Sequence, residues 1–174
     1  MKATGIVRRI DSLGRIVIPM EIRRTLRIRE NDALEIFTDR EGEIIFKKYS
    51  PIADLDEFAQ EYADSLFEST GHIALIADRD EIIAVAGASK KQFMGKALSP
   101  EIERIMEERQ TVVDNTDEAA IVDDYTAVHK AIAPIIHGGD LVGAVLLLSE
   151  DKDMGELEKK LCETAADFLA KQLG

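Results

Sequence analysis

The triplet Ile16-Val17-Ile18, closed by Pro19, limits what this chain can fold into more than any other short feature. Three consecutive aliphatic residues favour a short strand that is buried on both faces. Pro19 cannot donate to a strand ladder but suits the first turn of a helix, so residues 19–26 ("PMEIRRTL") predict one short helix. The fold must therefore bury both faces of a strand that leads directly into a helix.

Segments on either side of this triplet predict further strands. Residues 4–11 ("TGIVRRID") alternate and lead into a turn that ends at Gly14, and residues 32–49 predict a hairpin with its turn at 39–42. A segment of about fifty residues seldom buries enough apolar surface to be stable without a disulfide or a metal. A second copy could cover the exposed faces, so we expect residues 1–50 to form an obligate, intertwined dimer.

The cysteine content excludes the usual covalent supports of a small domain. Cys162 is the only cysteine in 174 residues, so the chain has no intramolecular disulfide and too few thiols for a zinc ribbon. We expect Cys162 to be a small buried helix residue. The amino terminus has no positively charged segment leading into a long apolar core, so we expect no export, and no stretch approaches the ~18–20 apolar residues of a membrane span. These observations predict a cytoplasmic protein.

The charge is divided unevenly along the chain. Residues 1–50 contain 11 Lys and Arg against 8 Asp and Glu, a net charge of +3, although the whole chain carries −12. Residues 51–174 contain 11 against 26, a net charge of −15. A basic end on an acidic protein is typical of nucleic-acid binding, and an ordinary solvated basic face is the alternative.

Residues 1–50 resemble the AbrB-type swapped-hairpin transcription regulators, in which two chains interleave their strands into one small barrel. The resemblance rests on the order Gly14-Arg15, aliphatic triplet, Pro19 and the Arg23-Arg24 pair. It implies that DNA is contacted by four arginines, Arg8, Arg15, Arg23 and Arg24, with Lys2, Arg9, Arg27 and Arg29 as a second set. Guanidinium is always charged and offers a planar fork to phosphates and guanine edges. Solvated faces or ion pairs with Glu21, Glu30 and Asp32 are the alternative for these arginines.

Residues 51–174 predict a second domain of the α+β class. Helices are expected at 52–70, 99–110 and 154–173, with strand pairs at 72–89 and 128–150. The large apolar residues of the first and last helices predict core stripes: Ile52, Leu55, Phe58, Tyr62 and Leu66, and Leu157, Leu161, Ala165, Phe168 and Leu169. This order resembles a GAF domain with an antiparallel sheet and flanking helices. The whole arrangement is similar to the stage V sporulation protein T family.

The resemblance implies a DNA-binding transcription regulator of sporulation genes, associated with the nucleoid of the forespore. The first and last helices of residues 51–174 could join two copies in a bundle, giving a dimer or a tetramer, and this domain could sense an unidentified small molecule. The alternative function is a metabolite sensor that acts on a protein partner and uses its basic end for assembly. Antitoxins share the swapped-hairpin domain but typically continue into a disordered tail, unlike residues 51–174.

No motif predicts catalysis, a cofactor or a metal. The only histidines, His72, His129 and His137, lack ligand spacing and are expected at the surface or at strand ends. The acidic residues in "DNTDEAAIVDDY" (114–125) lack the spacing of a calcium loop, and "GASKKQFMGK" (87–96) lacks the end of a phosphate-binding loop. We therefore expect a protein without enzymatic activity.

Overall fold

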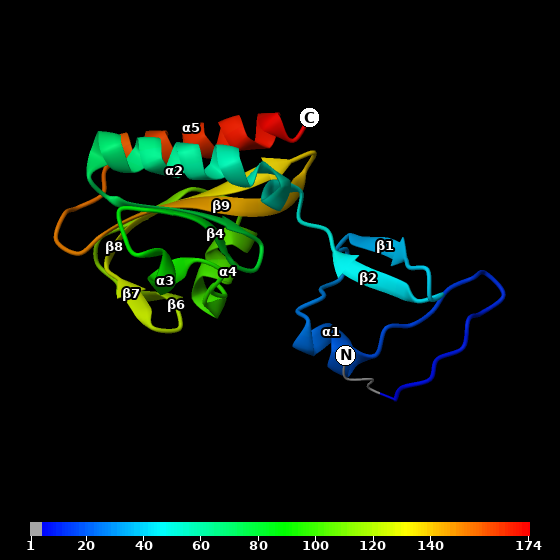
Figure 1. The fold of residues 1–174 in the computed structure, drawn as a ribbon. Helices are drawn as coiled ribbons and strands as arrows, with labels where there is room; N and C mark the ends of the chain where they lie inside the picture. The colour runs from blue at the N-terminus through cyan, green and yellow to red at the C-terminus, as the bar shows by residue number, and fades with distance from the viewer. Residues whose placement is uncertain (1–4) are drawn as a thin grey trace. The chain divides into compact units, whose positions relative to one another are not determined.

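The computed structural model describes residues 5–174, which form two compact units (Figure 1). The first unit ends at Tyr49 and the second is Ser50–Gly174. Each unit is described by itself. No helix in the described part of the chain combines the length and the apolar character that a membrane crossing requires.

The first unit contains one short helix and one hairpin. Helix α1 (Met20–Thr25) follows Pro19, whose φ of −55° and ψ of 146° make it the residue that caps the helix. Strands β1 (Leu34–Thr38) and β2 (Ile44–Lys48) pair in antiparallel fashion, with Leu34 opposite Lys48 and Thr38 opposite Ile44. Both elements lie where the sequence predicts them, because the proline and the turn residues act locally.

The two strands predicted before α1 have no ladder partner within residues 5–174. Residues 6–10 and 15–18 flank a tight turn in which Gly14 takes the left-handed conformation (φ 76°), but they form no strand. The Asp11 and Arg15 backbones close the turn, with the Asp11 N–H donating to the Arg15 carbonyl at 3.0 Å. A strand exists only when another strand accepts its hydrogen bonds, so these segments need pairing from outside the chain.

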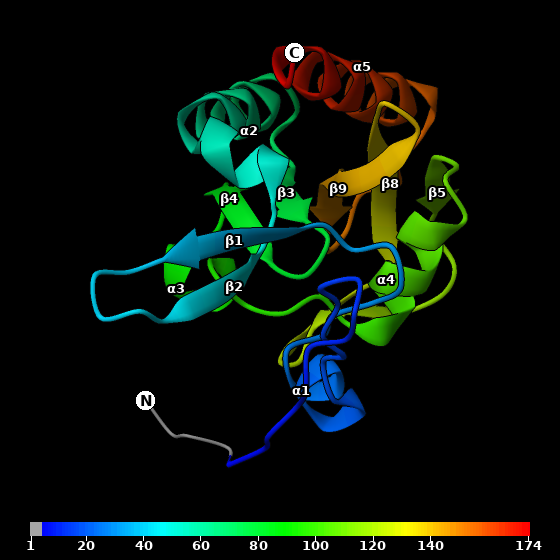
Figure 2. The same ribbon diagram turned by 90° about the vertical axis from the view of Figure 1, so that its right-hand side faces the viewer.

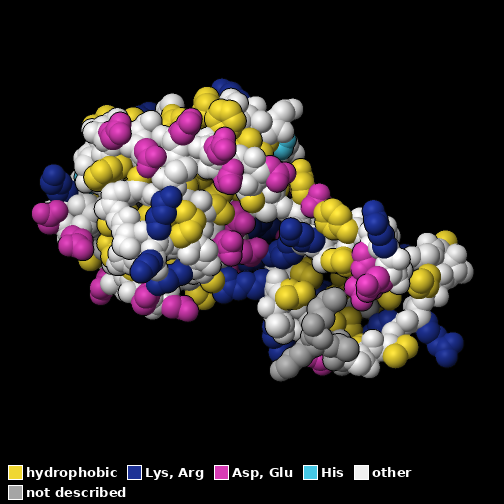
Figure 3. Space-filling view, viewed as in Figure 1, with side chains coloured by type: hydrophobic (Ala, Val, Ile, Leu, Met, Phe, Trp, Pro, Cys, Tyr) yellow, Lys and Arg dark blue, Asp and Glu magenta, His cyan; other side chains and the backbone are white. Residues whose placement is uncertain are grey.

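The first unit has almost no core of its own. Pro19 is the only buried residue among residues 5–49. The exposed apolar side chains of this unit are Ile6, Val7, Ile10, Leu13, Ile16, Val17, Met20, Leu26, Ile36, Phe37, Ile44, Ile45 and Phe46. In the space-filling view, hydrophobic side chains of this unit lie at the surface among charged ones (Figure 3). Exposed apolar surface of this extent marks an interaction site, and an isolated two-stranded hairpin is marginally stable at best.

The second unit has three layers around a five-stranded antiparallel sheet of order β4-β3-β9-β8-β5 (Figures 1 and 2). Its strands are β3 (Ile73–Asp78), β4 (Ile82–Ala86), β5 (Val112–Asp114), β8 (His129–His137) and β9 (Asp140–Ser149). One face is covered by α2 (Asp56–Thr70), which follows a 3-10 turn at Pro51–Leu55, and by α5 (Glu156–Gln172). The other face is covered by α3 (Lys90–Phe93), α4 (Pro100–Glu107) and the hairpin β6 (Ala119–Val122) and β7 (Tyr125–Ala127).

The helices α2 and α5 bury small residues, and the predicted core stripes are partly wrong. Helix α2 buries Ala59, Ala63 and Leu66, and α5 buries Cys162, Ala165, Ala166 and Leu169. Three large members of the predicted stripes are instead exposed, Phe58 at 48%, Leu157 at 65% and Phe168 at 38%. Small side chains let both helices lie close to the sheet, which leaves the large apolar residues on the flanks where α2 and α5 meet. Tyr62 and Phe168 contact each other there, with ring centroids 5.2 Å apart.

A buried lysine fastens the segment between β5 and β8. Lys130 is 2% exposed, and its Nζ donates to the Asp114 carboxylate at 3.1 Å and to the backbone carbonyls of Asp117 and Val128. All three ammonium protons are therefore used. Because these acceptors bracket the β6–β7 hairpin, Lys130 holds both ends of that hairpin to the sheet.

Candidate nucleic-acid interface

The turn before α1 holds Arg15 in a defined direction. Asp11 accepts the backbone N–H groups of Leu13 and Arg15 on Oδ1, both at 2.9 Å. Its other oxygen, Oδ2, accepts Nε of Arg15 at 2.8 Å. The backbone and side-chain hydrogen bonds from Arg15 lower the pKa of the Asp11 carboxyl, so it stays ionised at neutral pH. The Arg15 side chain remains 72% exposed.

Helix α1 carries Arg23 and Arg24 in its last turn, where the helix dipole favours positive charge. Arg23 Nε donates to the backbone carbonyl of Ile18 at 3.0 Å, across the start of the helix. Arg23 is half-buried, whereas Arg24 is exposed. No hydrogen bond joins the Arg24 guanidinium to any other part of residues 5–174. The two neighbouring arginines are thus held differently.

The second set of basic residues has mainly structural surroundings. Arg27 ends α1 in the left-handed conformation (φ 54°), and the following N–H, of Ile28, donates to the Arg23 carbonyl at 2.7 Å. This is the helix-ending arrangement that usually employs glycine. The Arg29 N–H donates to Asp32 Oδ2 at 2.8 Å. Arg9 is exposed, and Lys2 lies outside the described residues.

The first unit contains all four arginines that the resemblance implies. Arg8 lies before the Asp11 turn, Arg15 lies at this turn, and Arg23 and Arg24 lie in α1. The backbones of Arg15, Arg23 and Arg24 are held by local features: the Asp11 turn, Pro19 and the end of α1. Such a surface can neutralise phosphates and present guanidinium forks to base edges. The sequence predicts Asp11 only as part of the segment that leads into the turn ending at Gly14. Its position four residues before Arg15, across a turn that ends in glycine, is the signal for the contact.

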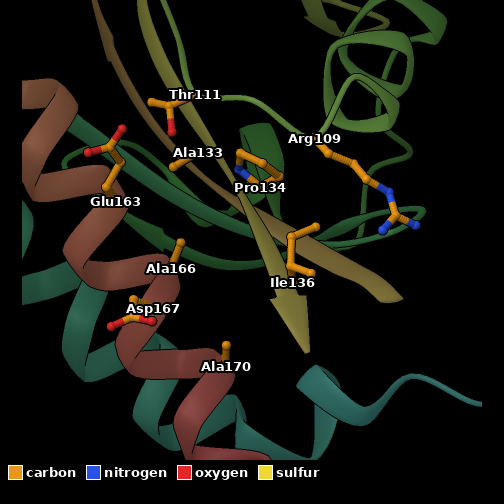
Figure 4. Close-up of a pocket in the computed structure, with 9 residues that line it drawn as sticks. All are labelled: Arg109, Thr111, Ala133, Pro134, Ile136, Glu163, Ala166, Asp167 and Ala170. Atoms are coloured by element: carbon orange, nitrogen blue, oxygen red, sulfur yellow. The ribbon is translucent and has the colours of Figure 1, made fainter. Parts of the chain in front are cut away.

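A second candidate site is a hollow of about 220 Å³ in the second unit, between α5 and the part of β8 that extends past β5. Ligand pockets are usually larger, ~300–1,000 Å³. In Figure 4 the Arg109 side chain runs away from α5, and its Nη1 donates to the Gly139 carbonyl. The hollow is lined by Arg109, Thr111, Ala133, Pro134, Ile136, Glu163, Ala166, Asp167 and Ala170. Because the hollow is small and its arginine already donates to Gly139, we assign no ligand to it.

The opposite face of the sheet is closed by apolar side chains. Phe93, Ile102, Ile121 and Ile132 are completely buried there, and the Phe93 ring meets the Tyr125 ring edge-on at 4.8 Å. This packing fills the space between the sheet and its α3–α4 cover.

Carboxylates and histidines gather little in the part of the chain that the structure describes. Within residues 5–174 the carboxylates that come together are those of Asp39, Glu41 and Glu43, all exposed, and Asp39 is occupied by accepting the N–H groups of Glu41 and Glu43. His129 and His137 are the two ends of β8, as predicted, whereas His72 is 5% exposed and contacts Glu158 at 3.2 Å.

Comparison with known proteins gives matches to both units. The family model described as stage V sporulation protein T C-terminal, transcription factor, matches residues 54–174. The model described as antidote-toxin recognition MazE, bacterial antitoxin, matches residues 7–54.

Two proteins of Bacillus subtilis (strain 168) are similar in sequence. Stage V sporulation protein T is 54% identical over 178 aligned positions, which cover 99% of each chain. The transition state regulatory protein AbrB is 48% identical over 83 positions, covering 48% of this chain and 85% of AbrB. Among solved structures, the GAF domain of a phosphoenolpyruvate-protein phosphotransferase from Coxiella burnetii has a TM-score of 0.58 at 19% identity, covering 68% of this chain and 82% of that one. This likeness confirms the GAF-like fold of the second unit.

Proposed function

Because the chain belongs to the stage V sporulation protein T family, we propose that it is a DNA-binding transcription regulator of sporulation genes. Residues 1–50 bind duplex DNA. Residues 51–174 hold several copies of the chain together, so that the DNA-binding units act jointly. The protein acts without catalysis, at the nucleoid of the developing spore. Its relative AbrB is a transition state regulatory protein, and its alignment with 48% of this chain supports the DNA-binding role.

One observation carries this proposal: the unit that holds the four arginines has almost no core of its own. Of residues 5–49 only Pro19 is buried, and two segments with strand-like sequence lack partners. A second copy supplies both the missing strands and the missing core. The resulting dimer presents Arg8, Arg15, Arg23 and Arg24 twice. If all eight neutralised phosphates, log K would fall with log salt at a slope on the order of −7.

A second contact between copies uses the exposed flanks of α2 and α5. Leu157, Leu161 and Phe168 repeat along α5 at spacings of four and seven, the pattern of a helix that packs against other helices. Phe58 and Tyr62 continue this apolar strip on α2, next to Phe168. Packing two such pairs into a four-helix bundle joins dimers into a tetramer.

Small-molecule sensing is the second role that the GAF-like fold favours for this unit. A ligand on the α3–α4 side would have to displace side chains such as Phe93 and Ile121, which are completely buried. Assembly therefore requires less rearrangement than sensing does.

The test compares full-length wild type with Arg23→Ala/Arg24→Ala. The probe is a duplex selected from a random-sequence library by the wild-type protein, and its shuffled counterpart is the reference. Fluorescence anisotropy across a salt series should show loss of binding by the double variant, while sedimentation shows an unchanged assembly. Arg40→Ala/Lys47→Ala removes two exposed cations from the same unit and should bind like wild type.

Two outcomes contradict the proposal. Unchanged binding by Arg23→Ala/Arg24→Ala would remove these residues from the interface. A wild-type protein that selects no duplex would favour the alternative, a sensor that acts on a protein partner and uses its basic end for assembly.

A further inference from the structure

The four arginines of the proposed interface differ in how their guanidinium groups are held. Arg15 and Arg23 each donate Nε to an acceptor of the protein, Asp11 Oδ2 at 2.8 Å and the Ile18 carbonyl at 3.0 Å. Within residues 5–174 the guanidinium groups of Arg8 and Arg24 have no such hydrogen bond. Two arginines are therefore oriented and two are not.

A tether at Nε has a specific geometric consequence. Guanidinium is planar, so a hydrogen bond at Nε restricts the orientation of the group and leaves the two Nη nitrogens to present their outer N–H donors away from the tether. Two parallel N–H donors in a fixed plane match the O6 and N7 acceptors of guanine. A guanidinium that turns freely serves equally well as a positive charge beside a phosphate, where plane and direction matter less.

The Asp11 contact has little value except as an orienting device. An ion pair whose arginine is 72% exposed contributes little to stability, because water screens it. A carboxylate at a DNA-binding surface also opposes the approach of phosphates. Of the two carboxylate oxygens, only Asp11 Oδ1 supports the turn, since it accepts both backbone N–H groups. Oδ2 is left to act on Arg15.

We propose that the interface is divided into two kinds of contact: Arg15 and Arg23 read base edges, and Arg8 and Arg24 bind phosphates. Asp11 and the Ile18 carbonyl are the positioning groups of the base-reading pair. This division rests on the proposed DNA-binding function and adds to it the source of sequence selectivity.

Charge-conserving substitutions test the division. Lysine keeps the positive charge but loses the planar fork, so it replaces a phosphate contact better than a bidentate base contact. In the full-length protein, Arg15→Lys and Arg23→Lys should each lower the ratio of affinities for the selected and shuffled duplexes by at least about 30-fold, because the dimer makes each contact twice. Arg8→Lys and Arg24→Lys should leave this ratio unchanged.

The Asp11→Asn variant distinguishes the orienting effect of Asp11 on Arg15 from its negative charge and from its support of the turn. The amide oxygen can still accept the two backbone N–H groups, but the amide nitrogen cannot accept Arg15 Nε. The variant should lose selectivity like Arg15→Lys while binding the shuffled duplex at least as tightly as wild type, since a negative charge is gone. A merely electrostatic role for Asp11 would instead raise both affinities equally.

The outcomes distinguish this inference from the function on which it rests. Four lysine variants that behave alike, or an Asp11→Asn variant with wild-type selectivity, would overturn the division while leaving DNA binding intact. A wild-type protein that binds neither duplex would overturn the proposed function itself. Sedimentation of each variant checks that the assembly is preserved.

Discussion

Replacing Lys130 with methionine should destabilise the second unit. Methionine keeps most of the buried stem but removes the ammonium group, which donates to Asp114, Asp117 and Val128. Breaking a buried ion pair from one side costs ~3–5 kcal/mol. Here the cost is reduced, because the Asp114 side chain is 23% exposed and keeps two hydrogen bonds from Thr116. We expect a loss of about 2–4 kcal/mol, mostly from carbonyls left without donors.

This loss corresponds to a Tm lowered by about 8–16 °C for a unit of this size. Calorimetry of the full-length protein measures it, and Lys91→Met, at an exposed position of α3, is the matched control that should melt like wild type. The Thr116 N–H and the Lys130 ammonium hold the pKa of Asp114 well below its usual range. The stability that this carboxylate provides is therefore present above its ordinary pKa and is lost as the pH falls toward the lowered one.

The difference between wild type and Lys130→Met should accordingly persist from pH 5 to 8 and narrow below about pH 4. A variant that melts within a degree of wild type, or above it, would refute the reasoning. It would mean that the desolvation free energy of the buried ammonium is as large as the stabilisation from its three hydrogen bonds.

Two further predictions concern α5. Leu157→Ser/Phe168→Ser removes exposed apolar side chains of α5 and should halve the assembled mass in sedimentation, leaving the DNA-binding dimer; a tetramer that persists would place the dimer contact elsewhere. Burial raises the pKa of the Cys162 thiol to about 12, so the native protein at pH 8 should resist a thiolate-selective reagent that labels it fully in denaturant. Fast labelling of the native protein would show that α5 opens readily.

Local signals in the sequence predicted most of the elements. Pro19 fixes the start of α1, Ser99 caps α4 by accepting the Ile102 N–H, and Gly71 ends α2 in the left-handed conformation. Each depends on a few neighbouring residues, so it can be recognised without knowledge of the fold. The orientation of Arg15 by Asp11 is equally local, and its signal is an aspartate four residues before an arginine, across a turn that ends in glycine. Lys130 could not be predicted as a clamp, since its acceptors depend on how the β6–β7 hairpin returns to the sheet.

The predicted strands and core residues that the structure of a single chain does not show share one cause. Residues 6–10 and 15–18 have strand sequences without strand partners, and Phe58, Leu157 and Phe168 have core-like positions without a core around them. A periodic pattern shows that a face is meant to be buried, but not whether the covering surface belongs to the same chain. Both discrepancies are removed by the same step, addition of further copies. We therefore infer that the apolar pattern of this sequence specifies an assembly, and that the proposed DNA-binding arrangement of the arginines forms only within it.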